Sequence, residues 1–449
     1  MKKIVFLLSA MLLVVGASAQ RQIDTLAKYQ RSSLYSVLIK HTNLPYGSAI
    51  DSAFMLMPIP DKFNDHNLPV RSFESTVKKV KKAADNKKKD AANFVDIQTF
   101  FEQGEVGKAL VSKWFNRDNQ TGYCNMDLIS ERGFYDASQL DIRLAENSIR
   151  GKAQLADAGE KLIGNTYVLV NDITFIDRGN VSSGVATGLK IFGKLASAVT
   201  GVNLEGATNA AAKVVNDIDG FKVNVTSYLY RLSWDEDVLM DFYNNYYVDA
   251  STPKDQYVAN RNRFNAATSA DSVFALQYIG KTTTSAANLS SKVFASQSKE
   301  QQMLKVCTRA IDKSIVQLQR EYDEFKVNVP INKINDDGTV EVEIGLKEGV
   351  NVKSTYDVLM PTEDENGRLV YNKVGSIRPV EGKIWDNRFG ALEDAEALAQ
   401  DKDAKQAEGE EVGGDVNLTA TTFKITSGEK KIVPGCLVRE ATIKSTMKK

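Results

Sequence analysis

The stretch TYVLVNDITFI at residues 166–176 decides the fold class of this chain of 449 residues. Apolar side chains stand at both odd and even positions along it, so the strand that it predicts has two buried faces. A second long strand is predicted over 221–232 (FKVNVTSYLYRL), and a shorter one over 274–279. Strands buried on both faces need a layer of helices on each side. We therefore expect a central α/β sandwich domain over residues 119–324.

Helices with an apolar stripe accompany these strands. The clearest is predicted over 299–322, where one face holds Met303, Val306, Ala310, Ile311, Ser314, Leu318 and Tyr322. Further helices are predicted over 138–162 and 235–247, and a short strand over 126–130. The acidic run 235–237 opens the helix at 235–247, where negative charge offsets the helix dipole. Helix capping is therefore favoured over paired-carboxylate chemistry for this run.

Residues 20–118 are expected to form a mainly helical N-terminal region. Apolar positions at helical spacing predict helices over 24–40 and 94–115, and two prolines make 55–60 a loop or an edge. A basic run lies between these segments and consists of Lys78, Lys79, Lys81, Lys82, Lys87, Lys88 and Lys89. A solvated helix face is the favoured interpretation of this run. The alternative is docking to an acidic surface, such as anionic lipid or a partner protein.

The last part of the chain, residues 325–449, carries the period of β structure. Thr339, Glu341 and Glu343 alternate with apolar residues, which is typical of a half-buried strand. Hairpin turns are predicted at 335–338 and 366–367, because glycine there supplies a positive φ. We expect a small β-barrel or sandwich that is interrupted by a disordered acidic insertion at 390–416.

The first residues have the three parts of a cleavable secretory signal. A basic start at 1–3 precedes an apolar stretch at 4–15 and the small-residue pattern Ala17-Ser18-Ala19. Cleavage after Ala19 predicts a periplasmic or secreted protein. No cysteine follows the cleavage point, which disfavours an acyl anchor, and the terminal lysines disfavour an outer-membrane barrel.

Composition narrows the partners of the chain. Its 57 basic and 57 acidic residues balance, so no nucleic-acid partner is expected. Residues 180–216 are rich in small side chains and predict a helical insertion. Its helix at 185–202 is interpreted as a cover of the sheet, with an interfacial membrane or partner helix as the alternative. Among the cysteines, Cys307 lies on an apolar helix stripe and is expected in the core, while a Cys124–Cys436 disulfide is left open.

Residue patterns typical of catalytic or metal sites are few. The only histidines are His41 and His66, the cysteines show no metal-ligand spacing, and no Gly-x-Ser-x-Gly motif is present. The loop 179–184 lies between a predicted strand and a predicted helix but lacks the Gly-Lys-Ser/Thr ending of a phosphate loop. We therefore expect no enzyme activity, no cofactor and no metal.

Two stretches resemble known envelope proteins. In 126–176, the match is carried by Glu131-Arg132, Ala158-Gly159-Glu160, Leu162 and the strand 167–173. This stretch resembles the periplasmic α/β domain of the curli-secretion (CsgG-like) lipoprotein family and the middle domain of flagellar assembly protein T. Residues 338–380 resemble the C-terminal β-domain of the flagellar proteins through GTVEVEIGLKEGVNVKSTYDVL and VGSIRPV. The resemblance implies a role in periplasmic assembly, although the lipobox cysteine of the curli channel is missing.

From these patterns we expect a non-enzymatic periplasmic or cell-envelope protein that assembles with other envelope proteins. An alternative is a binding module for a glycan or small ligand, with Trp234, Tyr243, Tyr246 and Tyr247 as an aromatic surface. Core packing is nevertheless the favoured interpretation of these rings. A hydrolase with an unrecognised site is the second alternative. The identity of the partner and the oligomeric state are left open.

Overall fold

The structure is a computed structural model, and it describes residues 32–42, 46–76, 85–135, 162–176, 222–287, 298–326, 328–363, 365, 369–400 and 413–441. The expected signal at 1–19, the insertion at 180–216 and almost all of the helix expected at 138–162 lie outside these ranges. Within the described part, the chain has a mixed α+β fold with two large sheets.

The main sheet has the order β2-β1-β4-β5-β6, and β3 extends it by pairing with β1. These strands are β1 (Ser32–Lys40), β2 (Phe63–Asp65), β3 (Ser72–Glu74), β4 (Thr166–Ile176), β5 (Lys222–Leu232) and β6 (Leu276–Ala287). β1 is parallel to β2, β3 and β4, whereas β4, β5 and β6 form an antiparallel meander. The strands predicted at 166–176 and 221–232 are confirmed.

The helix expected at 24–40 is wrong for its described part, because residues 32–40 form β1. Leu34 and Leu38 are spaced like a helical stripe, but Tyr35, Val37 and Ile39 are equally buried on the opposite face. Pairing with β2 and β4 places this segment inside the sheet, where helices bury both of its faces, and this tertiary setting outweighs the local helical pattern. The described part of residues 20–118 does contain the helices α2 (Gly47–Leu56), α3 (Asp85–Gln103) and α4 (Val106–Trp114), but β1, β2 and β3 belong to the same sheet as β4 and β5, so a boundary between this region and the α/β domain at residue 118 is wrong.

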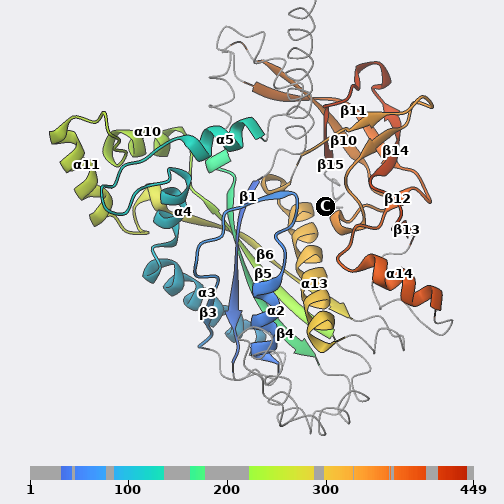
Figure 1. Cartoon of the computed structure of the whole chain (residues 1–449), viewed down its shortest axis with the longest axis horizontal. Helices are drawn as coiled ribbons and strands as arrows, with labels where there is room; N and C mark the ends of the chain where they lie inside the picture. The colour runs from blue at the N-terminus through green and yellow to red at the C-terminus, as the bar shows by residue number, and fades with distance from the viewer. Residues whose placement is uncertain are drawn as a thin grey trace, which may run out of the picture.

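Helices cover both faces of the main sheet (Figure 1). α2 (Gly47–Leu56) and α13 (Lys299–Glu321) pack on the face that carries Leu34, Leu38 and Leu229. α3 (Asp85–Gln103) and α4 (Val106–Trp114) pack on the face that carries Tyr35, Val37 and Tyr228. The sandwich follows from strands that are apolar on both sides. The helices predicted at 299–322 and 94–115 are confirmed, the second with a break at Gly104 and Glu105.

Short helices close one end of the main sheet around a third apolar cluster. They are α5 (Asp127–Tyr135), α10 (Glu236–Asn245), α11 (Lys254–Ala266) and η3 (Ser272–Phe274). The strand expected at 126–130 is wrong, because residues 127–130 begin α5, and Glu131-Arg132 of the family resemblance lies within the same helix. Asp235 caps α10, with its Oδ1 accepting the N–H of Val238 at 2.9 Å. This contact supports capping as the role of Asp235.

The second large sheet has the order β7-β15-β10-β11-β14-β9-β8. Its strands are β7 (Val329–Pro330), β8 (Lys333–Ile334), β9 (Val340–Val342), β10 (Tyr356–Glu363), β11 (Leu369–Pro379), β14 (Thr421–Ser427) and β15 (Leu437–Glu440). β12 (Ile384–Trp385) and β13 (Gly414–Asp415) form a separate pair. The turn predicted at 335–338 joins β8 to β9, with Gly338 at φ 77°. β7 and β8 are separated only by residues 331 and 332, whose backbone N–H groups donate to the carbonyls of Cys436 and Glu341, so the segment 329–334 links β15 to β9 at the two ends of this strand order.

The acidic insertion expected to be disordered over 390–416 is wrong for 391–400, which form α14 (Ala391–Gln400). Asp394 is buried and binds two cations of α13, with Arg309 Nη1 at 2.8 Å and Lys305 Nζ at 2.5 Å. Opposite charge on a neighbouring helix therefore orders part of this segment. α13 also holds the second sheet, because Arg320 lies 2.7 Å from the carbonyl of Gly349 and 3.1 Å from Glu440.

Candidate functional site

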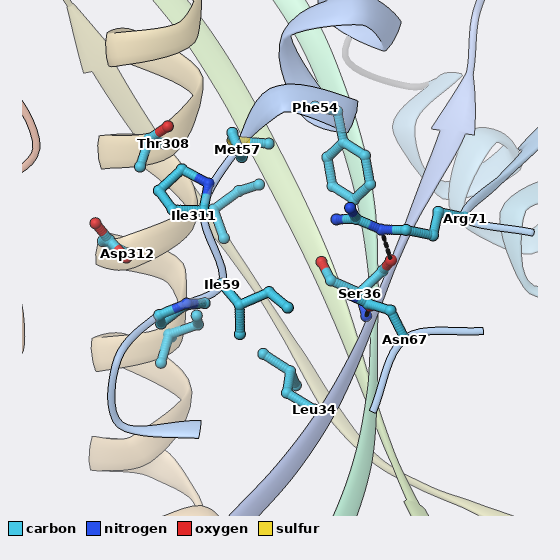
Figure 2. Close-up of a pocket in the computed structure, with 13 residues that line it drawn as sticks. Leu34, Ser36, Phe54, Met57, Ile59, Asn67, Arg71, Thr308, Ile311 and Asp312 are labelled. Carbon is cyan, nitrogen blue, oxygen red and sulfur yellow. Dashed lines mark hydrogen bonds between the residues drawn. The ribbon is translucent and has the colours of Figure 1, made fainter. Parts of the chain in front are cut away.

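A pocket lies on the main sheet between β1, the segment that leaves α2, and α13 (Figure 2). It encloses about 420 Å³ of empty space, including its mouth. Its apolar lining consists of Leu34, Phe54, Met57, Pro58, Ile59, Pro60, Ile311 and Ile315. Its polar lining consists of Ser36, Asn67, Arg71, Thr308 and Asp312. A narrow apolar space with a few polar groups on its wall is the usual form of a small binding site.

The chain after α2 creates this space. α2 ends at Leu56, and Pro58 and Pro60 follow within four residues. Proline cannot continue a helix, since it lacks an N–H and clashes with the preceding turn. The segment therefore leaves the sheet surface and passes beside α13, so that side chains of α2, β1 and α13 surround an unfilled space.

The edge of β1 is completed by side chains at the pocket. β2 pairs with β1 at Ser32–Leu34 and β3 pairs with it at Leu38–Lys40, so neither strand pairs with Ser36. Instead, Asn67 Oδ1 accepts the backbone N–H of Ser36 at 2.8 Å, and Arg71 Nε donates to the Ser36 carbonyl at 3.4 Å. These contacts place the Asn67 amide and the Arg71 guanidinium on the pocket wall.

Arg71 is the unusual group of this site. Its guanidinium lies 5.1 Å from the centre of the Phe54 ring, and burial lowers its pKa, with Asp65 and Tyr35 acting in the opposite direction. Among the described residues, no carboxylate lies within ion-pair distance of it, and its terminal nitrogens Nη1 and Nη2 have no hydrogen-bond partner. A half-buried cation without a counter-charge favours binding of an anion.

Asp312 contributes a negative charge beside the pocket. It is 8 % exposed, and burial raises its pKa to about 6, against the opposing attraction of Lys347 and Lys62. Lys62 and Lys347 belong to the contact between the main sheet and the second sheet, where Lys62 lies 4.0 Å from Glu348. Asp312 is therefore a titratable group of the α13 interface and does not pair with Arg71.

A second concentration of polar groups lies on the opposite face of the sheet, around Asp172. His41 Nε2 lies 2.6 Å from Asp172 Oδ1, while Lys89 Nζ and Asn93 Nδ2 lie 2.7 and 2.8 Å from Oδ2. Burial raises the pKa of Asp172, but the hydrogen bond from His41 and the charge of Lys89 outweigh this and lower it to about 2. The carboxylate is thus held ionised by its neighbours.

This Asp172 network continues across the sheet to α3 and β6. Tyr228 accepts from Asn93 at 3.1 Å and donates to Asp90 at 2.8 Å, and Lys281 binds Asp90. His41 and Asp172 have 3 % and 2 % of their side chains exposed. A His–Asp pair is part of many nucleophilic sites, but the described contacts of this pair are with Lys89, Asn93 and the sheet. Its geometry supports a role in attaching α3 to the sheet.

The other histidine, His66, is held in its neutral form. Its Nε2 lies 3.0 Å from the carbonyl of Leu110, and its Nδ1 lies 2.9 Å from Arg132 Nη1. Burial and the charge of Arg132 lower the pKa of His66 well below its ordinary value. Arg132 also stacks on Trp114 at 4.4 Å. The group joins α5 to the sheet edge and gives His66 a packing role.

The four aromatic residues proposed as a binding surface lie close together, but they pack against the third apolar cluster, at one end of the main sheet. Trp234, Tyr243, Tyr246 and Tyr247 are half-buried and pack around Phe242. Ring centres of Trp234 and Phe242 are 5.5 Å apart, and those of Tyr243 and Tyr247 are 5.2 Å apart. Extensive ring-to-ring contact supports core packing over a free binding face. Lys78, Lys79, Lys81 and Lys82 lie outside the described residues.

The three cysteines are free and buried in separate clusters, so Cys124 and Cys436 form no disulfide here. Cys307 lies in the core under α13, as predicted. In the ranges that the structure describes, no three His, Cys, Asp or Glu side chains are placed to hold a metal ion. The described helices also include none with the length and apolar character needed to cross a bilayer.

Comparison with known proteins gives no match, either to a protein-family model or to a curated protein.

Sequence reasoning missed the pocket and its Arg71. The available signal was local: an apolar helix end is followed by Met57-Pro58-Ile59-Pro60, which predicts a segment that leaves the surface. Nothing local connects this segment to Arg71 or to Ile311, because α13 lies far along the chain. The pocket therefore exists only through tertiary contacts.

Proposed function

We propose that the chain is an exported, non-enzymatic protein of the cell envelope that acts in assembly through contacts with a partner protein. The observation that carries this proposal is the apolar pocket with Arg71 on its wall, whose Nη1 and Nη2 have no partner among the described residues. Such a pocket is suited to hold one side chain of a partner segment and to orient it by charge. The resemblance to curli-secretion and flagellar assembly proteins, and the export signal, are in line with this role.

Exposed apolar residues that neighbour the pocket-lining residues in the sequence support a protein partner. Met55, Leu56 and Val70 are 41 %, 62 % and 58 % exposed, and each lies within two residues of a lining residue. Large apolar side chains that gather beside a pocket are typical of protein contact sites. A small polar ligand would leave these side chains in water.

A binding module for a small ligand remains the second candidate, and the same pocket favours it. The aromatic set around Trp234 is a weaker candidate for this function, because its rings pack on Phe242. Docking of the basic run or of the 185–202 helix to a membrane surface is a further proposal. We also propose that the chain consists of a periplasmic α/β domain followed by a C-terminal β-domain.

Site-directed photo-crosslinking in cells tests the proposed function. A photoreactive residue at Leu56 or Val70 lies beside the pocket, whereas the matched control at Val258 is 48 % exposed on α11, at another part of the molecule. We expect a discrete crosslinked species from the first two positions and none from Val258. Equal crosslinking at all three positions, or none at any of them, would contradict an assembly role for this pocket. Fractionation of the same cells tests the expected export.

A further inference from the structure

The geometry points to a specific ligand class for the pocket: an apolar group of amino-acid size that ends in a carboxylate, supplied by the C-terminal residue of a partner polypeptide. This inference rests on the proposed function, since it names the part of the partner that is recognised. It follows from three features of the wall: the Arg71 Nη1 and Nη2 and the Asn67 Nδ2 have no partner in the part of the chain that the structure describes, and most of the other lining side chains are apolar.

The guanidinium of Arg71 is the anion anchor. Its Nε is used by the Ser36 carbonyl, and its face lies 5.1 Å from the Phe54 ring, so its position is set by the protein before any ligand arrives. The two terminal nitrogens of Arg71, Nη1 and Nη2, lie on the side of the guanidinium that does not face the Ser36 carbonyl (Figure 2). Two parallel N–H donors match the two oxygens of a carboxylate, and a desolvated pair of this kind is stronger than one in water.

Asn67 supplies a second donor beside it. Its Oδ1 is committed to the Ser36 N–H at 2.8 Å, and its backbone carbonyl accepts from Lys113 at 2.7 Å. The amide is therefore held with a known orientation, and its Nδ2 has no partner among the described residues. This free N–H can bind a carboxylate oxygen or the last peptide carbonyl of the ligand.

Charge counting favours a carboxylate over a phosphate. Arg71 is the only cation in the pocket lining, and Asp312 adds a negative charge to the same lining. One positive charge can balance a carboxylate, whereas a phosphate with nearly two negative charges would need a second cation. A single guanidinium on the wall, with Asp312 nearby, is therefore better suited to a singly charged carboxylate than to a phosphate.

The apolar residues of the wall favour a ligand whose carboxylate is attached to an apolar side chain. Phe54, Met57, Ile59 and Ile311 enclose the space next to the guanidinium. A chain-terminal Leu, Ile or Phe would place its side chain among them while its carboxylate reaches Arg71. The exposed Leu56 and Val70 would then contact the residues that precede the chain end, which a free short-chain acid lacks.

Fluorescence anisotropy on the full chain tests the ligand class. The probes are labelled hexapeptides Gly-Ser-Gly-Ser-Ala-Leu as the free acid and as the C-terminal amide, and the same peptide ending in Lys. We expect the acid ending in Leu to bind at least about 10-fold more tightly than either of the others, because a charged hydrogen-bond pair is lost or an ammonium is buried. Competition by 4-methylpentanoate distinguishes a free acid from a chain end.

Two variants locate the effect at Arg71. Arg71→Gln should weaken binding of the acid about 10- to 100-fold and leave the weak binding of the amide unchanged. Arg71→Lys keeps the charge but not the planar fork, so it should recover only part of the affinity. Arg378→Gln removes an exposed guanidinium of β11 and serves as the matched control. Thermal melting of each variant confirms folding.

Each outcome decides one part of the inference. If acid and amide bind equally, or neither binds, recognition of a carboxylate is overturned, while crosslinks at Leu56 and Val70 would still support the assembly role. If 4-methylpentanoate competes as well as the peptide itself, the chain end is overturned as the source. If Arg71→Gln binds the acid like the unaltered chain, the anchor lies elsewhere.

Discussion

The two faces of the main sheet handle buried polar groups in opposite ways. Under α3, the carboxylate of Asp172 receives contacts from His41, Lys89 and Asn93. Under α2 and α13, Arg71 lies at a pocket with Nη1 and Nη2 unpaired among the described residues. A paired buried charge contributes to a fixed structure, whereas a half-buried guanidinium with open donors can receive an anionic ligand. The contrast separates a face that holds the fold from a face suited to binding.

The largest expected effect is at the face under α3. Asp172→Asn leaves Lys89 without its counter-charge and His41 without its carboxylate partner, and breaking a buried pair of this kind costs about 3–5 kcal/mol of unfolding free energy. Because the folded pKa of Asp172 is about 2 and lies below the ordinary 3.8, its contribution is present above pH 3.8 and is lost as the pH falls through 2. Urea denaturation at pH 7 measures the loss.

The control for this substitution is Asp237→Asn, at an exposed carboxylate of α10. It should change the unfolding free energy by less than about 0.5 kcal/mol. A loss of similar size in both variants would show that the Asp172 network does not hold α3 on the sheet.

The second largest expected effect is a gain in unfolding free energy, and it concerns Asp312, which lies beside the pocket. Burial raises the pKa of Asp312 to about 6, above 3.8, so the folded state holds its proton more tightly than the unfolded chain. The stability that this proton provides is full below pH 3.8 and is lost as the pH rises through 6. Asp312→Asn should therefore be more stable than the unaltered chain at pH 7.5, by up to about 3 kcal/mol, and equal to it near pH 3.8.

Denaturation curves at the two pH values, with the exposed Asp255→Asn of α11 as control, measure this difference. The attraction of Lys62 and Lys347 works against the gain, so a destabilised Asp312→Asn at pH 7.5 would mean that the lysine pairs outweigh burial.

The smallest expected effect on stability is at Arg71 itself. Among the described residues, the only hydrogen bond of its side chain is the long one of 3.4 Å to the Ser36 carbonyl, so Arg71→Gln should lower the unfolding free energy by less than about 1 kcal/mol. The same variant is expected to lose most of the binding of the acid peptide. A loss above about 2 kcal/mol would instead place Arg71 with Asp172 as a structural group.

Individual segments show how much of the secondary structure local sequence patterns predict. Residues 166–176 and 299–321 have periods that allow only one arrangement, and both elements form where they were predicted. Residues 32–40 fit a helix and a two-faced strand equally well, and the strand forms because β2 and β4 lie on either side of it. Residues 391–400 look like a solvated acidic stretch, but Asp394 meets Lys305 and Arg309 of a distant helix.

By itself, the sequence determined the strands that are apolar on both faces, the amphipathic α13, the hairpin turn at Gly338 and the cap at Asp235. Each of these depends on neighbours within a few residues, whose spacing sets which groups can be buried or bonded. Only the tertiary structure decided that β1 belongs to the same sheet as β4, and that Arg71, Phe54 and Ile311 surround one pocket. Those contacts join residues far apart in the chain, and no local period records them.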